Sequence, residues 1–205
     1  MANAAIAVNL TQDLIGRING MHRVVERIAV EQSATELCQS FGPTAPPIAW
    51  HIWHLIRWAD RVQATLPNGT DHPDPDYGIW QQQRLAVQWG LNPTKLGLFE
   101  SGVSMAFADA QTLCEQMEQA ALVDYAAAVV ERTTGLLNTL TVEEMGMVRL
   151  SPRNFRINNG AALLLPNHEA EVFPDLTFLL AHGSRHLGMI EALRGLLQRA
   201  GSASI

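Results

Sequence analysis

The sequence predicts an all-α fold, an up-down four-helix bundle with long connections. Apolar residues recur with a helical period in four or five segments, and no segment shows the alternation of a half-buried strand. Stretches rich in Pro and Gly separate the helical segments. Helices with one apolar face bury it most simply against one another. At 205 residues the chain suffices for one core and is short for two domains, so we expect residues 1–205 to form a single domain.

The sequence signals for helix formation are clearest in the first two helices. Over residues 10–31 the apolar side chains keep a helical period, and Thr11 is placed to cap the N-terminus. The stretch "CQSFGPTAPPIAW" then turns the chain, and Pro47 suits the first turn of a second helix over residues 47–66. Residues 67–76 are rich in turn-forming Pro, Asp, Gly and Asn, so the second helix ends there.

The middle of the chain carries weaker signals. Residues 77–109 are mixed, with a short helix expected in "WQQQRLAVQW". Residues 104–140 are again helical, with a joint between two helices expected at Asp124–Tyr125. Residues 149–170 have the character of a long connection, which is uncommon in a domain unless it covers something functional.

Composition narrows the classes of function. The chain is 47% hydrophobic and 17% charged, which is typical of a globular protein. Its net charge of -6, with 14 Lys and Arg, leaves no basic surface for nucleic acid. We find no signal-peptide pattern and no apolar run long enough to cross a membrane, so we expect a cytoplasmic protein. Cys38 and Cys114 lack a CxxC spacing and are expected to be reduced, buried thiols.

The last helix carries two histidines on its apolar face. We expect it to begin near Glu171 or Asp175 and to end at "QRAGSAS". His182 and His186 are four residues apart, which places them one turn apart on the same face. Burying two imidazoles among apolar side chains is unfavourable unless each finds a partner, and one metal ion would satisfy both. The alternative is that each imidazole bonds a neighbouring carbonyl or side chain.

A third imidazole is available in the "WHIWHLIRWAD" stretch of the second helix. Catalytic zinc and iron sites commonly use three protein ligands and leave a position open. His51 flanks the apolar stripe of this helix, whereas His54 lies further round with Trp50, Trp58 and Arg61. Helical geometry alone favours neither histidine as the third ligand. The tryptophans have an ordinary alternative role in packing between helices.

The spacing of residues in the sequence supports no other metal-binding or catalytic motif. No histidine has Glu three residues before it, as di-iron bundles require, and the motifs of zinc proteases, serine hydrolases, P-loops and dinucleotide-binding folds are absent. His22, His72 and His168 have no histidine partner by spacing. For these three we expect a surface position or a local hydrogen bond.

The chain resembles the DinB/YfiT-like superfamily of four-helix bundles, which includes bacterial thiol-dependent S-transferases and mycothiol-dependent maleylpyruvate isomerases. The matching stretches are "WHIWHLIRWAD" and "HGSRHLGMIEALRG". The resemblance implies a metal triad of His54, His182 and His186, with His54 chosen because the ligand position precedes an Arg by three in "HLIRWAD". His51 is then a reserve ligand or a group beside the metal or the substrate.

The resemblance also implies an activity. A divalent metal, Zn, Ni or Fe, would activate a low-molecular-weight thiol for attack on an electrophile, giving an S-transferase or isomerase. Trp50, Trp58 and Arg61 would shape the mouth of the site, with the Arg as a carboxylate clamp. The family implies a homodimer. Two alternatives stay open: a metal-dependent hydrolase that uses water at the same site, and a non-catalytic or structural bundle.

Overall fold

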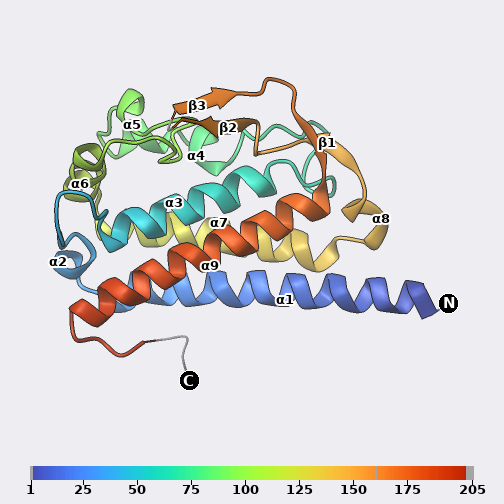
Figure 1. Ribbon diagram of the computed structural model, residues 1–205, viewed down its shortest axis with the longest axis horizontal. Helices are drawn as coiled ribbons and strands as arrows, with labels where there is room; N and C mark the ends of the chain where they lie inside the picture. The colour runs from blue at the N-terminus through green and yellow to red at the C-terminus, as the bar shows by residue number, and fades with distance from the viewer. Residues whose placement is uncertain (1, 160, 202–205) are drawn as a thin grey trace.

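Four long helices dominate the computed structural model, which describes residues 2–159 and 161–201 (Figure 1). They are α1 (Ala2–Glu31), α3 (Ile48–Gln63), α7 (Gln119–Thr139) and α9 (Val172–Leu196). The closest packing is of α3 on α9 and α7, and of α1 on α7 and α9. The four helices therefore form a ring of neighbours, with α1 and α3 across its diagonal.

The helix directions differ from the predicted up-down order. In Figure 1, α1 and α9 run toward the same end of the bundle, and α3 and α7 run toward the other end. Adjacent α3 and α7 are thus parallel. The cause is the long connection over residues 64–118, which returns the chain to the end where α3 began. The fold is mostly helical, as predicted, but its helices do not simply alternate in direction.

Helix α3 is enclosed on every side. All of its residues from Ile48 to Gln63 are buried, because α9 and α7 pack on it and the connection to α7 covers its remaining face. That connection contains α4 (Ile79–Gln82), α5 (Leu85–Gln88), the 3-10 helix η1 (Pro93–Lys95) and α6 (Phe107–Gln116). The polar side chains of α3 consequently need partners inside the protein.

Two helix boundaries differ from the expectation. Helix α1 begins at Ala2, well before residue 10. Helix α7 runs unbroken through Asp124–Tyr125, so the predicted joint is wrong. The break lies instead at Met117 and Glu118, where both residues are extended. Tyr125 stays helical because its side chain is buried against α3, which the local sequence does not reveal.

The predicted long connection over residues 149–170 contains strands. β1 (Val148–Leu150) pairs antiparallel with β4 (Glu169–Glu171), and β2 (Phe155–Asn158) pairs antiparallel with β3 (Ala161–Leu164). Each strand has three or four residues, too few to show an alternating pattern. Two four-residue helices, α2 (Ala34–Leu37) and α8 (Val142–Met145), begin with capping boxes.

Among the described residues, no helix combines the length and the apolar composition that a bilayer span requires.

Candidate metal centre

Three imidazoles from two helices meet inside the bundle. His54 comes from α3, and His182 and His186 come from α9, the helix packed against it. One ring nitrogen from each lies within 4.8 Å of the other two, and the Nε2 atoms of His54 and His182 are 3.2 Å apart. For comparison, two nitrogens bound to one tetrahedral zinc at about 2.1 Å lie about 3.4 Å from each other.

The three imidazoles are held in their neutral form. Burial, with the neighbouring His186 and Arg185, lowers the pKa of His182 to about 3. Burial and Arg185 lower the pKa of His186 to about 4, and burial with the two other histidines lowers the pKa of His54 well below its usual range. Neutral imidazoles offer lone pairs to a metal, so this donor set fits a divalent cation that accepts nitrogen ligands.

The orientation of His54 is fixed by a backbone carbonyl. Its Nδ1–H donates to the carbonyl oxygen of Ser101, in the loop before α6. Because a carbonyl only accepts, the proton must be on Nδ1, and the lone pair of Nε2 faces His182. Trp50 stacks on the ring, with centroids 4.7 Å apart and planes 8° apart.

His51 is bonded to the cluster from outside. Its Nδ1 lies 2.9 Å from the Nδ1 of His186. If Nε2 of His186 holds a metal, its Nδ1 carries the proton and donates to His51. The structure thus brings both histidines of α3 to the site in different positions, with His54 in the three-nitrogen cluster and His51 behind His186.

Aromatic side chains close one side of the cluster. Phe178 stacks on His182 at 5.2 Å, and Trp58 meets the same ring edge-on at 5.5 Å. Trp58 is buried and also contacts Phe155 of β2, so the β2–β3 pair covers this wall. Nδ1 of His182 has no hydrogen-bond partner among the described residues. Trp58 is therefore a wall of the site and does not stand at an open mouth.

An apolar pocket opens on the other side. It has a volume of about 490 Å³, within the usual range for small-molecule sites, and His51, His186 and Trp50 stand at its inner end. Met189 and Leu193 of α9 line this pocket. The full set of described lining residues is Thr44, Ala45, Pro46, Trp50, His51, Phe107, His186, Met189, Ala192, Leu193 and Leu196.

Arg61 does not have the position expected of a substrate clamp. Its guanidinium is fully buried, forms an ion pair with Asp76 and donates to Pro152 O and Asn154 Oδ1. It also packs on the ring of Phe99. These contacts arise because α3 is covered on all sides, so an arginine on its polar face is enclosed by the connection instead of facing a ligand.

A family comparison agrees with the predicted resemblance. The model of the DinB superfamily matches residues 17–172. The chain belongs to the DinB superfamily. The match includes both histidines of α3 and ends at the first residue of α9, so the placement of His182 and His186 beside them rests on the structure. No curated protein matches the chain in a sequence comparison.

Like His51, the other histidines of this DinB-superfamily chain do not belong to the three-histidine cluster. His72 is exposed and His168 is half-buried. His22 contradicts the expectation, because it is fully buried and neither ring nitrogen has a partner among the described residues. Both cysteines are free thiols, but only Cys114 is buried as expected, whereas Cys38 is half-buried; the two are neighbours in space, with Cys38 Sγ 3.0 Å from the carbonyl oxygen of Cys114.

Two residues beside the three-histidine cluster have roles that the sequence does not indicate. Ser101 acts through its backbone carbonyl, which every residue possesses. Gly102 lies so close to the site that a Cβ there would be 2.8 Å from Nδ1 of His54 and 2.9 Å from Trp50. The only sequence hint is the pair of glycines, Gly97 and Gly102, in the region of mixed signals.

Proposed function

We propose that this DinB-superfamily chain is a metal-dependent S-transferase or isomerase that joins a low-molecular-weight thiol to an apolar electrophile. The observation that carries the proposal is the three-histidine cluster beside an apolar pocket. His54, His182 and His186 would hold a divalent metal, Zn, Ni or Fe. When bound, that ion would lower the pKa of a thiol beside it and so favour the thiolate near neutral pH.

The protein's own groups position the reactants. The pocket excludes water from the electrophile, because apolar side chains such as Met189 and Leu193 form most of its described lining. With His186 donating from Nδ1 to His51, the proton of neutral His51 is on Nε2. His51 lines the pocket, so this N–H is available to donate to a polar atom of the electrophile.

The pocket favours thiol chemistry over hydrolysis. Its described lining contains neither Asp nor Glu, so no carboxylate stands ready to remove a proton from water. A thiol, with an ordinary pKa near 8.5, needs much less assistance than water to become a nucleophile. The resemblance on which the thiol rests also implies a homodimer, and the sequence predicts a single-domain, cytoplasmic protein; we include both in the proposal.

A conjugation assay tests the activity. Metal-loaded protein is incubated with monochlorobimane and either bacillithiol, mycothiol or glutathione, and formation of the fluorescent conjugate is followed. We expect a rate above that of the metal-free protein with at least one thiol. Equal rates for loaded and metal-free protein with all three thiols would contradict the transferase proposal. Release of acid from an ester substrate by the loaded protein would favour the hydrolase.

A further inference from the structure

A strained loop presses against the proposed metal ligand His54. It comprises residues 97–104, between η1 and α6, and we call it the Ser101 loop. Positive φ angles occur at five of its positions: Gly97, Phe99, Glu100, Gly102 and Ser104. Three of these residues are not glycine, and residues with a side chain adopt this conformation only where the surroundings enforce it. The loop therefore requires support from outside.

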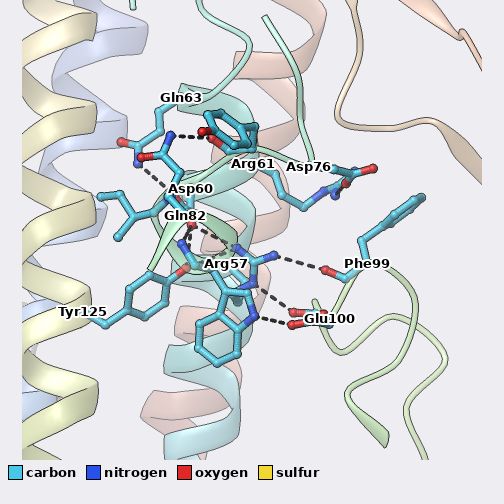
Figure 2. A network of polar contacts seen from close by, with 12 residues as sticks. Arg57, Asp60, Arg61, Gln63, Asp76, Gln82, Phe99, Glu100 and Tyr125 are labelled. Atoms are coloured by element: carbon cyan, nitrogen blue, oxygen red, sulfur yellow. Dashed lines mark hydrogen bonds and ion pairs between the residues drawn. The ribbon is translucent and has the colours of Figure 1, made fainter. Parts of the chain in front are cut away.

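Arg57 supplies that support. It lies one turn after His54 on α3 and is fully buried. Its Nη2 donates to the carbonyl of Phe99 at 3.1 Å, and its Nε donates to the carbonyl of Glu100 at 2.9 Å. Figure 2 shows the guanidinium between α3 and these two carbonyls. One planar group thus holds the two peptide units that directly precede Ser101, whose own carbonyl accepts from His54.

The opposite side of the Arg57 guanidinium is fixed by a buried carboxylate. Nη1 of Arg57 lies 3.0 Å from Oδ2 of Asp60, and the hydroxyl of Tyr125 on α7 donates to the same oxygen at 3.0 Å (Figure 2). Asp60 also accepts from the backbone N–H groups of Ile79 and Trp80. With these donors around it, and the side-chain amide of Gln63 as a fifth, the carboxylate has little freedom to move, so the guanidinium has one available position.

The loop can approach His54 only because Gly102 has no side chain. A Cβ at this position would be 2.8 Å from Nδ1 of His54 and would push the loop or the ring away. Glu100 adds a further restraint, because its carboxylate accepts from the indole N–H of Trp80 at 2.7 Å. The Ser101 loop is consequently held at the carbonyls of Phe99 and Glu100 and at the Glu100 side chain. It also touches the ring of His54 directly.

We propose that Arg57, anchored by Asp60, is a positioning residue that fixes the ring orientation and the tautomer of His54 through the Ser101 loop. The inference rests on the proposed metal site, because its expected consequence is that a misaligned His54 binds the metal more weakly. The chain of contacts runs from Asp60 to Arg57, then to the carbonyls of Phe99 and Glu100, and finally from Ser101 to His54. The first and last links are buried, and the two links from Arg57 to the loop carbonyls are partly buried.

Two variants test this inference from opposite sides. Arg57→Lys keeps the charge, but a single ammonium cannot bridge both carbonyls and Asp60. Gly102→Ala leaves Arg57 intact and displaces the loop directly. For both we expect the dissociation constant for Co(II) to rise about 10- to 100-fold. In metal-free protein, nitrogen NMR of the imidazoles should show His54 protonated on Nδ1 in the wild type and a mixture of tautomers in the variants.

Arg149→Lys is the matched control, because Arg149 is also a buried arginine paired with a buried aspartate, Asp175, but makes no contact with the Ser101 loop. It should lose stability and keep the cobalt affinity. A folded Arg57→Lys with wild-type affinity and tautomer would overturn the inference, as would equal weakening in Arg149→Lys. If Arg57→Lys does not fold, Asp60→Asn takes its place, because it removes the carboxylate that anchors Arg57, and wild-type affinity and tautomer in that variant would overturn the inference. If the wild type binds no cobalt, the proposed function fails, and the tautomer measurement still tests the inference.

Discussion

His22 of α1 is a buried imidazole that has no hydrogen-bond partner among the described residues. It is fully enclosed, and burial lowers its pKa to about 4. In the unfolded chain the imidazole has its ordinary pKa near 6.5. Between pH 6.5 and about 4 the unfolded state therefore binds a proton that the folded state does not, so this residue makes stability fall as the pH falls.

Replacing His22 should remove that pH dependence. We predict that His22→Leu raises the free energy of unfolding, with a gain that increases by about 3 kcal/mol between pH 7 and pH 4, since one pKa unit corresponds to 1.36 kcal/mol. The measurement is urea unfolding of the metal-free protein across this range. His72→Leu, at an exposed histidine, is the control. Parallel pH profiles for His22→Leu and the wild type would contradict the prediction.

The two histidines of α3 should have separable effects on metal binding. His54→Ala removes a proposed ligand and should abolish binding. His51→Ala removes only the group bonded to Nδ1 of His186, and changes at such positions typically weaken metal binding 10- to 100-fold. Titration with Co(II) measures both. Loss of binding in His51→Ala with retention in His54→Ala would reverse the assignment of the ligand.

Among the elements, α4 is held to α3 by Asp60. The carboxylate of Asp60 accepts from the first two N–H groups of α4, and Gly78 directly precedes that helix. A Cβ on Gly78 would be 2.7 Å from the carboxylate. The glycine is thus required by a close approach and not by its backbone angles, because its φ is −77°.

Gly→Ala substitutions at two positions should change the stability of the fold in opposite directions. Gly78→Ala should destabilise the fold by about 1–3 kcal/mol, because it forces Asp60 from its partners. Gly135→Ala, inside α7 with nothing within 4 Å of the new Cβ, should stabilise it by about 1 kcal/mol through helix propensity. Chemical denaturation measures both. A neutral Gly78→Ala would show that Asp60 can move.

Helix α9 contributes part of its surface to the apolar pocket in which we propose that the electrophile binds. Ala192→Trp should fill much of the space between α9 and Pro46 and lower kcat/KM for conjugation at least tenfold, while Co(II) affinity stays unchanged. Ala120→Trp changes an exposed alanine of α7 that is not part of this lining and serves as the control. Unchanged kcat/KM in Ala192→Trp would place the electrophile elsewhere.

Local sequence predicted the long helices and short helical structure in "WQQQRLAVQW", where α4 and α5 lie, but it missed the strands. The periodic segments of α1, α3 and α9 contain many turns, so their apolar stripes are evident. The strands β1 and β4 have three residues each, and their pairing joins chain segments that lie far apart in sequence and are brought together by the fold. The wrong joint at Asp124–Tyr125 has the same origin, because the contact that retains Tyr125 in α7 is with Asp60, far away in the chain.

At the scale of the whole molecule, the histidine pair on α9 was predictable and its surroundings were not. A spacing of four places His182 and His186 on one face whatever the tertiary fold. The choice between His51 and His54 depends on how α3 rotates against α9, and the wheel of a helix that is buried all round gives no such information. The buried position of Arg61 has the same cause.

The parallel arrangement of α3 and α7 explains why the connection between them matters for the site. To return along α3, residues 64–118 must cover its outer face, and in doing so they bring the Ser101 loop to His54. The DinB-superfamily bundle thus supplies the three proposed ligands from two helices, and the connection supplies the carbonyl that orients one of them. We propose above all that His54, His182 and His186 hold one metal ion together.

Metal content is the most direct measurement of that claim. The wild type, His54→Ala, His182→Ala, His186→Ala and the control His72→Ala are purified, reloaded with Zn(II) or Co(II), and analysed by mass spectrometry of the bound metal. The account predicts about one ion per chain in the wild type and control, and loss of the ion in each of the three ligand variants. Full occupancy in His182→Ala, or no binding by the folded wild type, would contradict it.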